Sequence, residues 1–330
     1  MAVMTYMEAS RQALIEEMRR DPRVWAVGED LGRGGVFGQY KGLSEEFGVE
    51  RIADAPISEA CIMGAATGAA MMGSRPVVEM RFSDFALCAT DELVNQAAKA
   101  RYMFGGQTRV PLVVRQPIGM WRSSAAQHSQ SLESWYTHIP GLVVICPSTP
   151  ADNKGLLKSA IRCDDPVVYM EHKLLWPLEG EVPDDDQVVP IGKASVVRPG
   201  KDLTLVTWSA TVHVAVKAAA QLAESGIDVE IIDLRTLWPW DKTAVLASVQ
   251  RTGRLLVAHE AVSVAGFGAE VVATVSEALY DRLIAPPTRV AAPRIHIGYA
   301  PTLEDEVRVT PRRLIDAATR LVKTQSGRTR

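Results

Sequence analysis

The stretch RIADAPISEACIMGAATGAAMMGSRPVVEMRFSDF, residues 51–85, places a helical pattern directly before a strand pattern. Residues 58–73 are small, apolar and uncharged apart from Glu59, and a helix that is apolar all round is normally buried. Residues 75–82 contain consecutive valines, which is typical of a strand covered by helices on both faces of its sheet. The stretch therefore predicts a buried helix next to a buried strand in a parallel α/β fold.

The same alternation extends in both directions along the chain. We expect a helix at the N-terminus, strands at 23–29, 110–117, 141–147 and 165–171, and helices at 91–104 and 150–162. A second unit follows, with strands at 202–208, 228–235 and 254–260 and helices at 211–225, 241–252, 267–282 and 310–323.

Length and composition indicate how this pattern is divided into domains. The chain has 330 residues, and single hydrophobic cores stop growing near ~250 to 300 residues. Prolines and acidic residues are concentrated in residues 176–190, which show neither the helical nor the strand periodicity of apolar residues. We therefore predict an α/β fold of two doubly wound domains, at 1–176 and 197–330, with a linker at 177–196.

Charge and cysteine usage exclude several classes of partner. A formal charge of -3 gives no broad positive field, so the sequence favours neither nucleic acid nor a membrane surface as a partner. The four cysteines form no C-x-x-C pair, which favours a reducing cytoplasm over a disulfide framework. The N-terminus lacks the order of a signal peptide, and no apolar run approaches the ~20 residues that span a bilayer.

Familiar catalytic motifs are missing. The glycine-rich segment 28–42 fits neither G-x-G-x-x-G nor G-x-x-x-x-G-K-[ST], so a loop without bound phosphate is favoured there. Segment 266–270 could hold an anion at a helix start or simply form a tight turn. No G-x-S-x-G elbow or zinc-ligand spacing appears. Of the histidines, His259 lies at a strand end where α/β sheets place ligands, whereas four others are interpreted as structural: His138, His172, His213 and His296.

Two residues have both a structural and a chemical interpretation. Ser58 could cap the helix while Glu59 complements its dipole. Alternatively, the smooth face made by Gly64 and Gly68 lets another backbone exclude water, and desolvation equips Glu59 for proton chemistry. His128 lies in a loop before a helical pattern. Its imidazole could act as an acid or base at a cleft, or it could cap backbone groups of the loop.

Three stretches together resemble the beta subunits of thiamine-diphosphate-dependent 2-oxo acid dehydrogenases, which are transketolase-like. They are residues 51–85, AAQHSQSLESWYTHIPGLVVICPSTPADNKGLLKSAIRCDDPVVYMEHKLLW at 125–176, and IDLRTLWPWD at 232–241. The resemblance runs from about residue 4 to 323 and is closest to the pyruvate and acetoin dehydrogenase members, with EHKLLW and GEVP favouring the acetoin type. A branched-chain 2-oxo acid dehydrogenase, or an α/β assembly module that lost the site, remain alternatives.

The resemblance implies an N-terminal pyrimidine-binding domain and an α2β2 heterotetramer in which thiamine diphosphate lies between subunits. The alpha subunit holds the diphosphate and magnesium through a G-D-G motif, which this chain lacks. The reaction implied is decarboxylation of a 2-oxo acid or cleavage of acetoin, followed by acyl transfer to a lipoyl domain on the acyltransferase core. The C-terminal domain is implied to serve beta–beta contact and docking to that core.

The same resemblance assigns site residues. It implies that Glu59 shares a proton with a pyrimidine nitrogen of the cofactor, that Phe85 packs on the pyrimidine, and that Ile57 lines the pocket. His128 matches a histidine implicated in proton transfer during acyl transfer. Backbone oxygens that hold a structural potassium ion in some members align with Leu112, Ala160, Ile161, Cys163 and Asp165, although Cys163 and Asp165 depart from the pattern. Arg81 is given no role, because relatives carry other residues there.

Overall fold

A computed structural model describes residues 1–184 and 186–324, and these fall into two compact units. Unit 1 comprises residues 1–118 and 135–191, and unit 2 comprises 119–134 together with the chain from 192 onward. The segment 119–134 therefore leaves unit 1 between two of its elements and groups with unit 2. Each unit is described by itself below.

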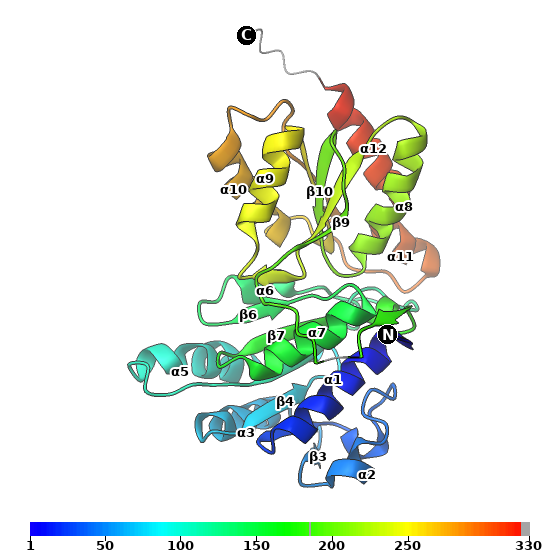
Figure 1. Ribbon diagram of the computed structural model, residues 1–330. Helices are drawn as coiled ribbons and strands as arrows, with labels where there is room; N and C mark the ends of the chain where they lie inside the picture. The colour runs from blue at the N-terminus through cyan, green and yellow to red at the C-terminus, as the bar shows by residue number, and fades with distance from the viewer. Residues whose placement is uncertain (185, 325–330) are drawn as a thin grey trace. The chain divides into compact units, whose positions relative to one another are not determined.

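Unit 1 alternates strands and helices (Figure 1). Its strands are β1 (Ala2–Thr5), β2 (Val24–Gly28), β3 (Ile52–Asp54), β4 (Arg75–Glu79), β5 (Val113–Ile118), β6 (Val143–Ile145), β7 (Val167–His172) and β8 (Glu179–Val182). Its helices are α1 (Tyr6–Arg20), α2 (Leu43–Phe47), α3 (Glu59–Met71), α4 (Ser83–Ala86), a π-helical segment (Glu92–Ala97), α5 (Ala98–Met103) and α7 (Pro150–Arg162), while α6 (Glu133–Thr137) begins in the 119–134 segment.

The main sheet of unit 1 is parallel, with strands in the order β6-β7-β5-β4-β2-β3. One face is covered by α1 and α7, whose apolar residues share a core cluster with residues of the strands. Local sequence starts these helices. Thr5 and Glu8 form a reciprocal capping box at α1, and Thr149 caps α7 with Pro150 in its first turn.

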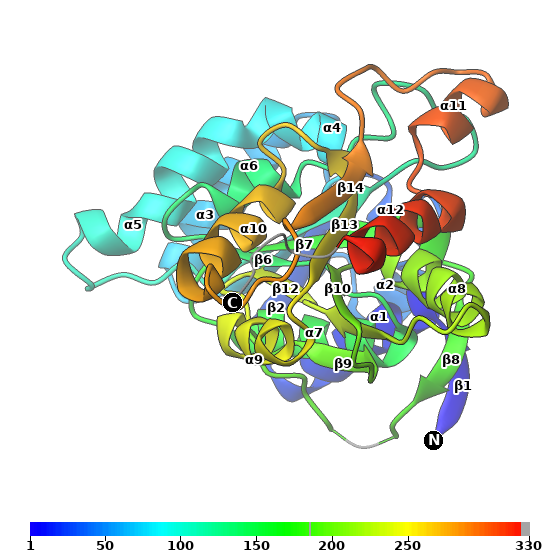
Figure 2. The ribbon, with the colours of Figure 1, turned by 90° about the horizontal axis from the view of Figure 1, so that it is seen from above.

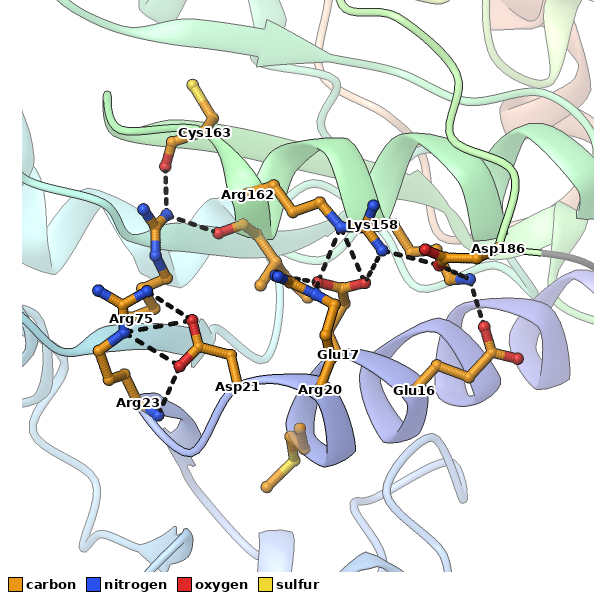
Figure 3. A network of polar contacts seen from close by, with 12 residues as sticks. Glu16, Glu17, Arg20, Asp21, Arg23, Arg75, Lys158, Arg162, Cys163 and Asp186 are labelled. Carbon is orange, nitrogen blue, oxygen red and sulfur yellow. Dashed lines mark hydrogen bonds and ion pairs between the residues drawn. The ribbon is translucent and has the colours of Figure 1, made fainter.

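Ion pairs join α1 to α7 along their contact (Figure 3). The buried Glu17 carboxylate accepts from Arg162, with Nη2 at 2.6 Å from Oε1, and Glu16 pairs with the buried Lys158 ammonium. Asp186 Oδ1 forms ion pairs with Lys158 Nζ at 3.0 Å and with Arg162 Nη2 at 2.7 Å. Because Glu17 is shut away from water, its pairing fixes the two helices relative to each other.

Unit 2 is a second α/β layer built on the sheet order β14-β13-β10-β11-β9 (Figure 2). The strands are β9 (Ser195–Arg198), β10 (Leu203–Thr207), β11 (Val229–Asp233), β13 (Leu255–Val262) and β14 (Thr288–Ala292), and a further short strand is β12 (Thr236–Trp238). Its helices are α8 (Thr211–Glu224), α9 (Lys242–Thr252), α10 (Phe267–Leu279), α11 (Pro301–Val307) and α12 (Pro311–Lys323). All pairings are parallel except that of β9 with β11, and residues of α8 and α12 share one core cluster with the strands.

The predicted α/β fold is confirmed, and several local predictions are wrong. The predicted N-terminal helix is confirmed as α1, but β1 precedes it, because residues 2–5 pair antiparallel with β8. Residues 91–104 do not form one regular helix, since Glu92–Ala97 is π-helical. Residues 176–190 contain β8, so this stretch has regular structure of its own.

Helix α3 differs from its predicted burial. Ile62, Met63 and Ala66 are buried on one side, whereas Ala60, Cys61, Ala65 and Gly68 on the other side are exposed. The prediction of all-round burial is therefore wrong for this chain by itself. An apolar helix side with no cover within the described residues is typical of a surface made for another chain.

Candidate active site

Three neighbouring parallel strands bring charged residues to one sheet edge. Glu29 directly follows β2, Glu59 begins the helix after β3, and Arg81 comes two residues after β4. Since β4, β2 and β3 lie side by side, their carboxyl ends meet, which is where open α/β sheets bind ligands. Arg81 Nε lies 3.6 Å from Glu29 Oε2, and Glu59 is close enough to raise the pKa of Glu29.

Glu59 is the first residue of α3 and is half-buried. The expected cap by Ser58 is wrong, because the Ser58 hydroxyl donates to the Pro56 carbonyl at 3.0 Å and makes no cap hydrogen bond. Ile57, just before it, is 79% exposed. A carboxylate and an apolar side chain thus stand together at an open edge, ready to face a molecule or chain outside this one.

Phe85 lies on α4, directly after the strand that leads to Arg81. Its ring meets Phe82 edge-to-face, with centroids 5.7 Å apart and an interplanar angle of 64°. Phe82 is held from other sides by Phe37, at 6.2 Å between centroids, and by the Lys173 ammonium, 4.5 Å from its centroid. Phe85 is half-buried, so it presents part of a supported aromatic surface.

A buried charge cluster underlies this edge and was missed by sequence reasoning. Arg115 of β5 lies 3.2 Å from Glu79 of β4 and 2.5 Å from Glu171 of β7, and all three side chains are almost inaccessible. Burial raises the pKa of Glu79, which Arg115 opposes, and Tyr40 donates its hydroxyl to the Glu79 carboxylate at 3.0 Å. The sequence did contain a signal for this cluster: each of the three apolar strands carries a charged residue, and the charge is negative at Glu79, positive at Arg115 and negative at Glu171. The cluster ties three strands together just before the edge that carries Arg81.

His128 lies in the 119–134 segment of unit 2, whereas Glu59 and Phe85 belong to unit 1. The segment contains residues in left-handed backbone conformations, with φ values of 50°, 55° and 61° at Arg122, Ser123 and Ala125. Such strain in residues other than glycine is uncommon and often accompanies functional sites. His128 itself is half-buried.

Unit 2 holds the 119–134 segment at both ends. At the start, Glu260 of β13 accepts the Met120 N–H at 2.7 Å. At the end, Trp208 Nε1 donates to Glu133 at 3.1 Å, and the Ser134 hydroxyl accepts the N–H of Phe267 at 3.0 Å. These contacts fix the two ends of the loop, so His128 is presented between anchored ends.

His259 is packed as a structural residue within β13, which continues to Val262 beyond the predicted strand end. Its ring stacks on Trp208 at 5.1 Å between centroids and 14° between planes, and burial lowers its pKa to about 4. A Cβ at Gly268 would lie 2.8 Å from His259 Nε2, so the glycines of α10 and its cap exist here for close packing. The turn interpretation of segment 266–270 is therefore favoured over an anion site.

Four of the five backbone oxygens aligned with a potassium site already accept hydrogen bonds. Arg75 Nη1 donates to the backbone oxygen of Cys163 at 2.9 Å (Figure 3). It also donates to the backbone oxygen of Ile161 at 2.9 Å, and Nη2 donates to the Asp164 carboxylate at 2.5 Å. The backbone oxygens of Leu112 and Ala160 accept the N–H groups of Val167 and Cys163. A carbonyl oxygen has two lone pairs, so one donor leaves room for a further ligand.

Glu59 does not line either of two hollows in the described part of the chain. One, of about 510 Å³, is lined by residues of α5 and the chain after it together with Gly141, Asp165 and Pro166. The other, of about 80 Å³ in unit 2, is lined by residues of the 119–134 segment together with Glu260 and His296. Among the described residues, no three His, Cys, Asp or Glu side chains gather as a metal site, and no helix is long and apolar enough to cross a membrane.

Comparisons with known proteins decide the family. Residues 2–178 match the model of the transketolase pyrimidine binding domain, and residues 192–314 match the transketolase C-terminal domain. The chain is 45% identical to a 2-oxoisovalerate dehydrogenase subunit beta of Bacillus subtilis, over 97% of this chain and 98% of the relative. The chain belongs to the E1 beta-subunit family of 2-oxo acid dehydrogenases. This family is thiamine diphosphate dependent and consists of oxidoreductases.

Further relatives of this E1 beta-family chain carry other substrate names. It is 47% identical to an acetoin:2,6-dichlorophenolindophenol oxidoreductase subunit beta of Cupriavidus necator, over 90% of this chain and 91% of the relative. It is 46% identical to a pyruvate dehydrogenase E1 component subunit beta of Rhizobium meliloti, over 92% of this chain and 66% of the relative. A solved structure titled as a split gene transketolase, an inactive beta4 tetramer, matches with a TM-score of 0.78 at 21% identity, covering 98% of this chain and 99% of that one, which shows the fold alone.

Proposed function

We propose that the chain binds the pyrimidine of thiamine diphosphate at the edge formed by β2, β3 and β4, with Glu59 as its proton-sharing carboxylate. The observation that carries this proposal is a half-buried carboxylate at the start of α3, beside a second carboxylate and open to a partner surface. A flat heterocycle needs an acid to hold one nitrogen and apolar faces around it. Glu59, Phe85 and Ile57 supply those chemical types, so the residues present fit the cofactor.

Each residue then has a distinct part in the chemistry. Thiamine diphosphate, when bound, supplies the nucleophilic carbon that attacks the substrate carbonyl. Glu59 holds a proton at a carboxylate oxygen and shares it with the ring nitrogen. Phe85 and Ile57 pack on the ring and exclude water from that proton. His128 moves a proton while the acyl group passes to its acceptor, and its anchored loop ends limit how far it can stray.

A partner chain would complete this site. Ile57 is 79% exposed and one side of α3 is open, so the isolated chain offers half of a pocket. We propose an alpha subunit as the cover, holding the diphosphate and magnesium, in an α2β2 heterotetramer. The acyl acceptor would be a lipoyl domain of the acyltransferase core. The relatives are named as beta subunits, which supports a partner of this kind.

The substrate is proposed as pyruvate or acetoin, with branched-chain 2-oxo acids as the second candidate. Relatives named for all three lie between 45% and 47% identity, so identity does not separate them. The candidate substrates can be separated by measuring turnover of pyruvate, acetoin and 2-oxoisovalerate by the reconstituted complex. A preference for the branched acid of tenfold or more would replace the first proposal with the second.

A structural potassium ion also stays a proposal for the oxygens of Leu112, Ala160, Ile161, Cys163 and Asp165. Arg75 already brings a positive charge to two of these oxygens, so we expect the folded chain to depend only weakly on the potassium ion. Thermal unfolding of the full chain in KCl and in NaCl at equal ionic strength tests it. A higher Tm in KCl supports the ion, and equal values refute it.

The proposed role of Glu59 is tested by Glu59→Gln in the complex with the alpha subunit. The amide keeps the shape but cannot share the carboxylate's proton, so we expect turnover to fall at least ~100-fold while assembly is retained. Glu45→Gln is the matched control, because Glu45 is an exposed glutamate of α2. Near-normal turnover of Glu59→Gln would refute the site, whereas a wild-type complex without thiamine-dependent turnover would favour an assembly module.

A further inference from the structure

Arg81 lies between two carboxylates that follow β2. Its Nη1 donates to Asp30 Oδ2 at 3.0 Å, and its Nε lies 3.6 Å from Glu29 Oε2. The guanidinium reaches across from the end of β4, so it links two neighbouring strand ends at the edge that carries Glu59. The resemblance to relatives gave this residue no role, and the contacts now provide one.

The two carboxylates depend on Arg81 unequally. Asp30 is about a third exposed and has a second cation, Arg33, at 3.5 Å. Glu29 is 9% exposed, and among the described residues Arg81 is the one cation within ion-pair distance of it. Burial is the largest influence on Glu29 and raises its pKa, and the carboxylates of Glu59 and Asp30 raise it further. Arg81 is the influence that lowers it.

We propose that Arg81 is a positioning residue that keeps Glu29 ionised beside Glu59, so that Glu59 is the carboxyl group that shares the proton. Two close carboxylates resist ionising together, and an asymmetric counter-charge decides which one holds the proton. Without Arg81, the buried Glu29 becomes the better proton acceptor. This role at Glu59 rests on the proposed function, whereas the pairing of Arg81 with Glu29 does not.

The pairing is tested on the full chain without cofactor or partner, by thermal unfolding across about pH 5 to 7. In Arg81→Gln the ionised Glu29 loses its counter-charge, so its pKa rises further. A carboxyl whose folded pKa lies above its unfolded pKa loses stability as pH rises through that interval. We therefore expect the Tm deficit of Arg81→Gln, relative to wild type, to grow with pH.

Two further variants separate charge from shape. In a Glu29→Gln background the deficit from Arg81→Gln should be independent of pH, because the responding group is gone. Arg81→Lys should restore most of the wild-type pH dependence. Arg33→Gln is the matched control, since it removes an exposed arginine from the same cluster and leaves Glu29 untouched. A deficit that is constant with pH, or identical in both backgrounds, would overturn the pairing.

The consequence at Glu59 is tested in the complex with the alpha subunit. The acid limb of the kcat/KM profile should move to higher pH by about one unit in Arg81→Gln and return in Arg81→Lys. If the wild-type complex turns over normally and this limb does not move, the inference fails and the proposed function stands. If the wild-type complex shows no thiamine-dependent turnover, the proposed function fails, and with it the role at Glu59.

Discussion

Lowering the pH should destabilise unit 2 through His259. The ring is fully buried and stacked on Trp208, and Nδ1 lies 3.1 Å from the Ala261 carbonyl oxygen. A carbonyl only accepts, so Nδ1 carries the hydrogen and Nε2 is left without one. Nε2 has no hydrogen-bond partner among the described residues, and Gly266 and Gly268 pack close to the ring. A proton on Nε2 would therefore be buried and unsatisfied.

The magnitude follows from the lowered pKa. Burial takes the pKa of His259 from its ordinary value of 6.5 to about 4 in the folded chain. Between those values the unfolded chain binds a proton that the folded chain does not, so stability falls as pH falls. At about 1.4 kcal/mol per unit, the free energy of unfolding should lose about 3 kcal/mol by pH 4. The stabilisation is fully present above about pH 6.5.

Hydrogen exchange at the amides of β13 measures this directly, because it reports the opening of unit 2 rather than of the whole chain. The wild type and His259→Gln should be compared from pH 7 down to pH 4.5, after correction for intrinsic exchange. Glutamine has no charge to gain, so its protection should fall less steeply than that of wild type. His296→Gln, which changes an exposed histidine of the same unit, should follow wild type. Equal slopes for wild type and His259→Gln would refute the reasoning.

Three other changes have clear expected outcomes. Glu260→Ala removes the acceptor of the Met120 N–H, a charge-assisted hydrogen bond of about 2 kcal/mol, so limited proteolysis should cut the 119–134 segment faster, and unchanged cutting would contradict the anchoring. Glu17→Ala leaves Arg162 without its buried partner and should lower stability by about 2 kcal/mol in urea unfolding, less so with Glu17→Gln. Ile57→Ala should leave the Tm of the isolated chain unchanged because its side chain is exposed, while weakening thiamine diphosphate binding in the complex; a lower Tm would place Ile57 in the core instead.

Much of the fold was accessible from the sequence because its signals are local. The valine-rich runs that form β4, β5 and β7 are long enough for their composition to predict buried strands. Thr149 followed by Pro150 marks the start of α7. The short edge elements gave no such signal. Residues 2–5 form a strand only because a partner strand lies beside them, and that partner is 174 or more residues away in sequence.

The site was predicted less completely, for physical reasons. The resemblance selected Glu59, but only coordinates show that Glu29 and Arg81 share its sheet edge, since the strand order β4-β2-β3 is not the chain order. The exposed side of α3 could not be predicted from composition, because an apolar helix has the same sequence whether its own chain or another covers it. No pattern in residues 119–134 indicates that they group with unit 2.

That grouping bears on how the protein can be divided for experiments. A C-terminal fragment cut at residue 192 would be missing the loop that pairs with Glu260, Trp208 and Phe267. Glu260 would lose the Met120 donor, and the N–H groups of Trp208 and Phe267 would lose their acceptors. Supplying residues 119–134 as a synthetic peptide should rescue such a fragment. Gene truncations drawn at the apparent boundary would otherwise yield aggregates whose cause, the missing residues 119–134, lies far upstream of the cut.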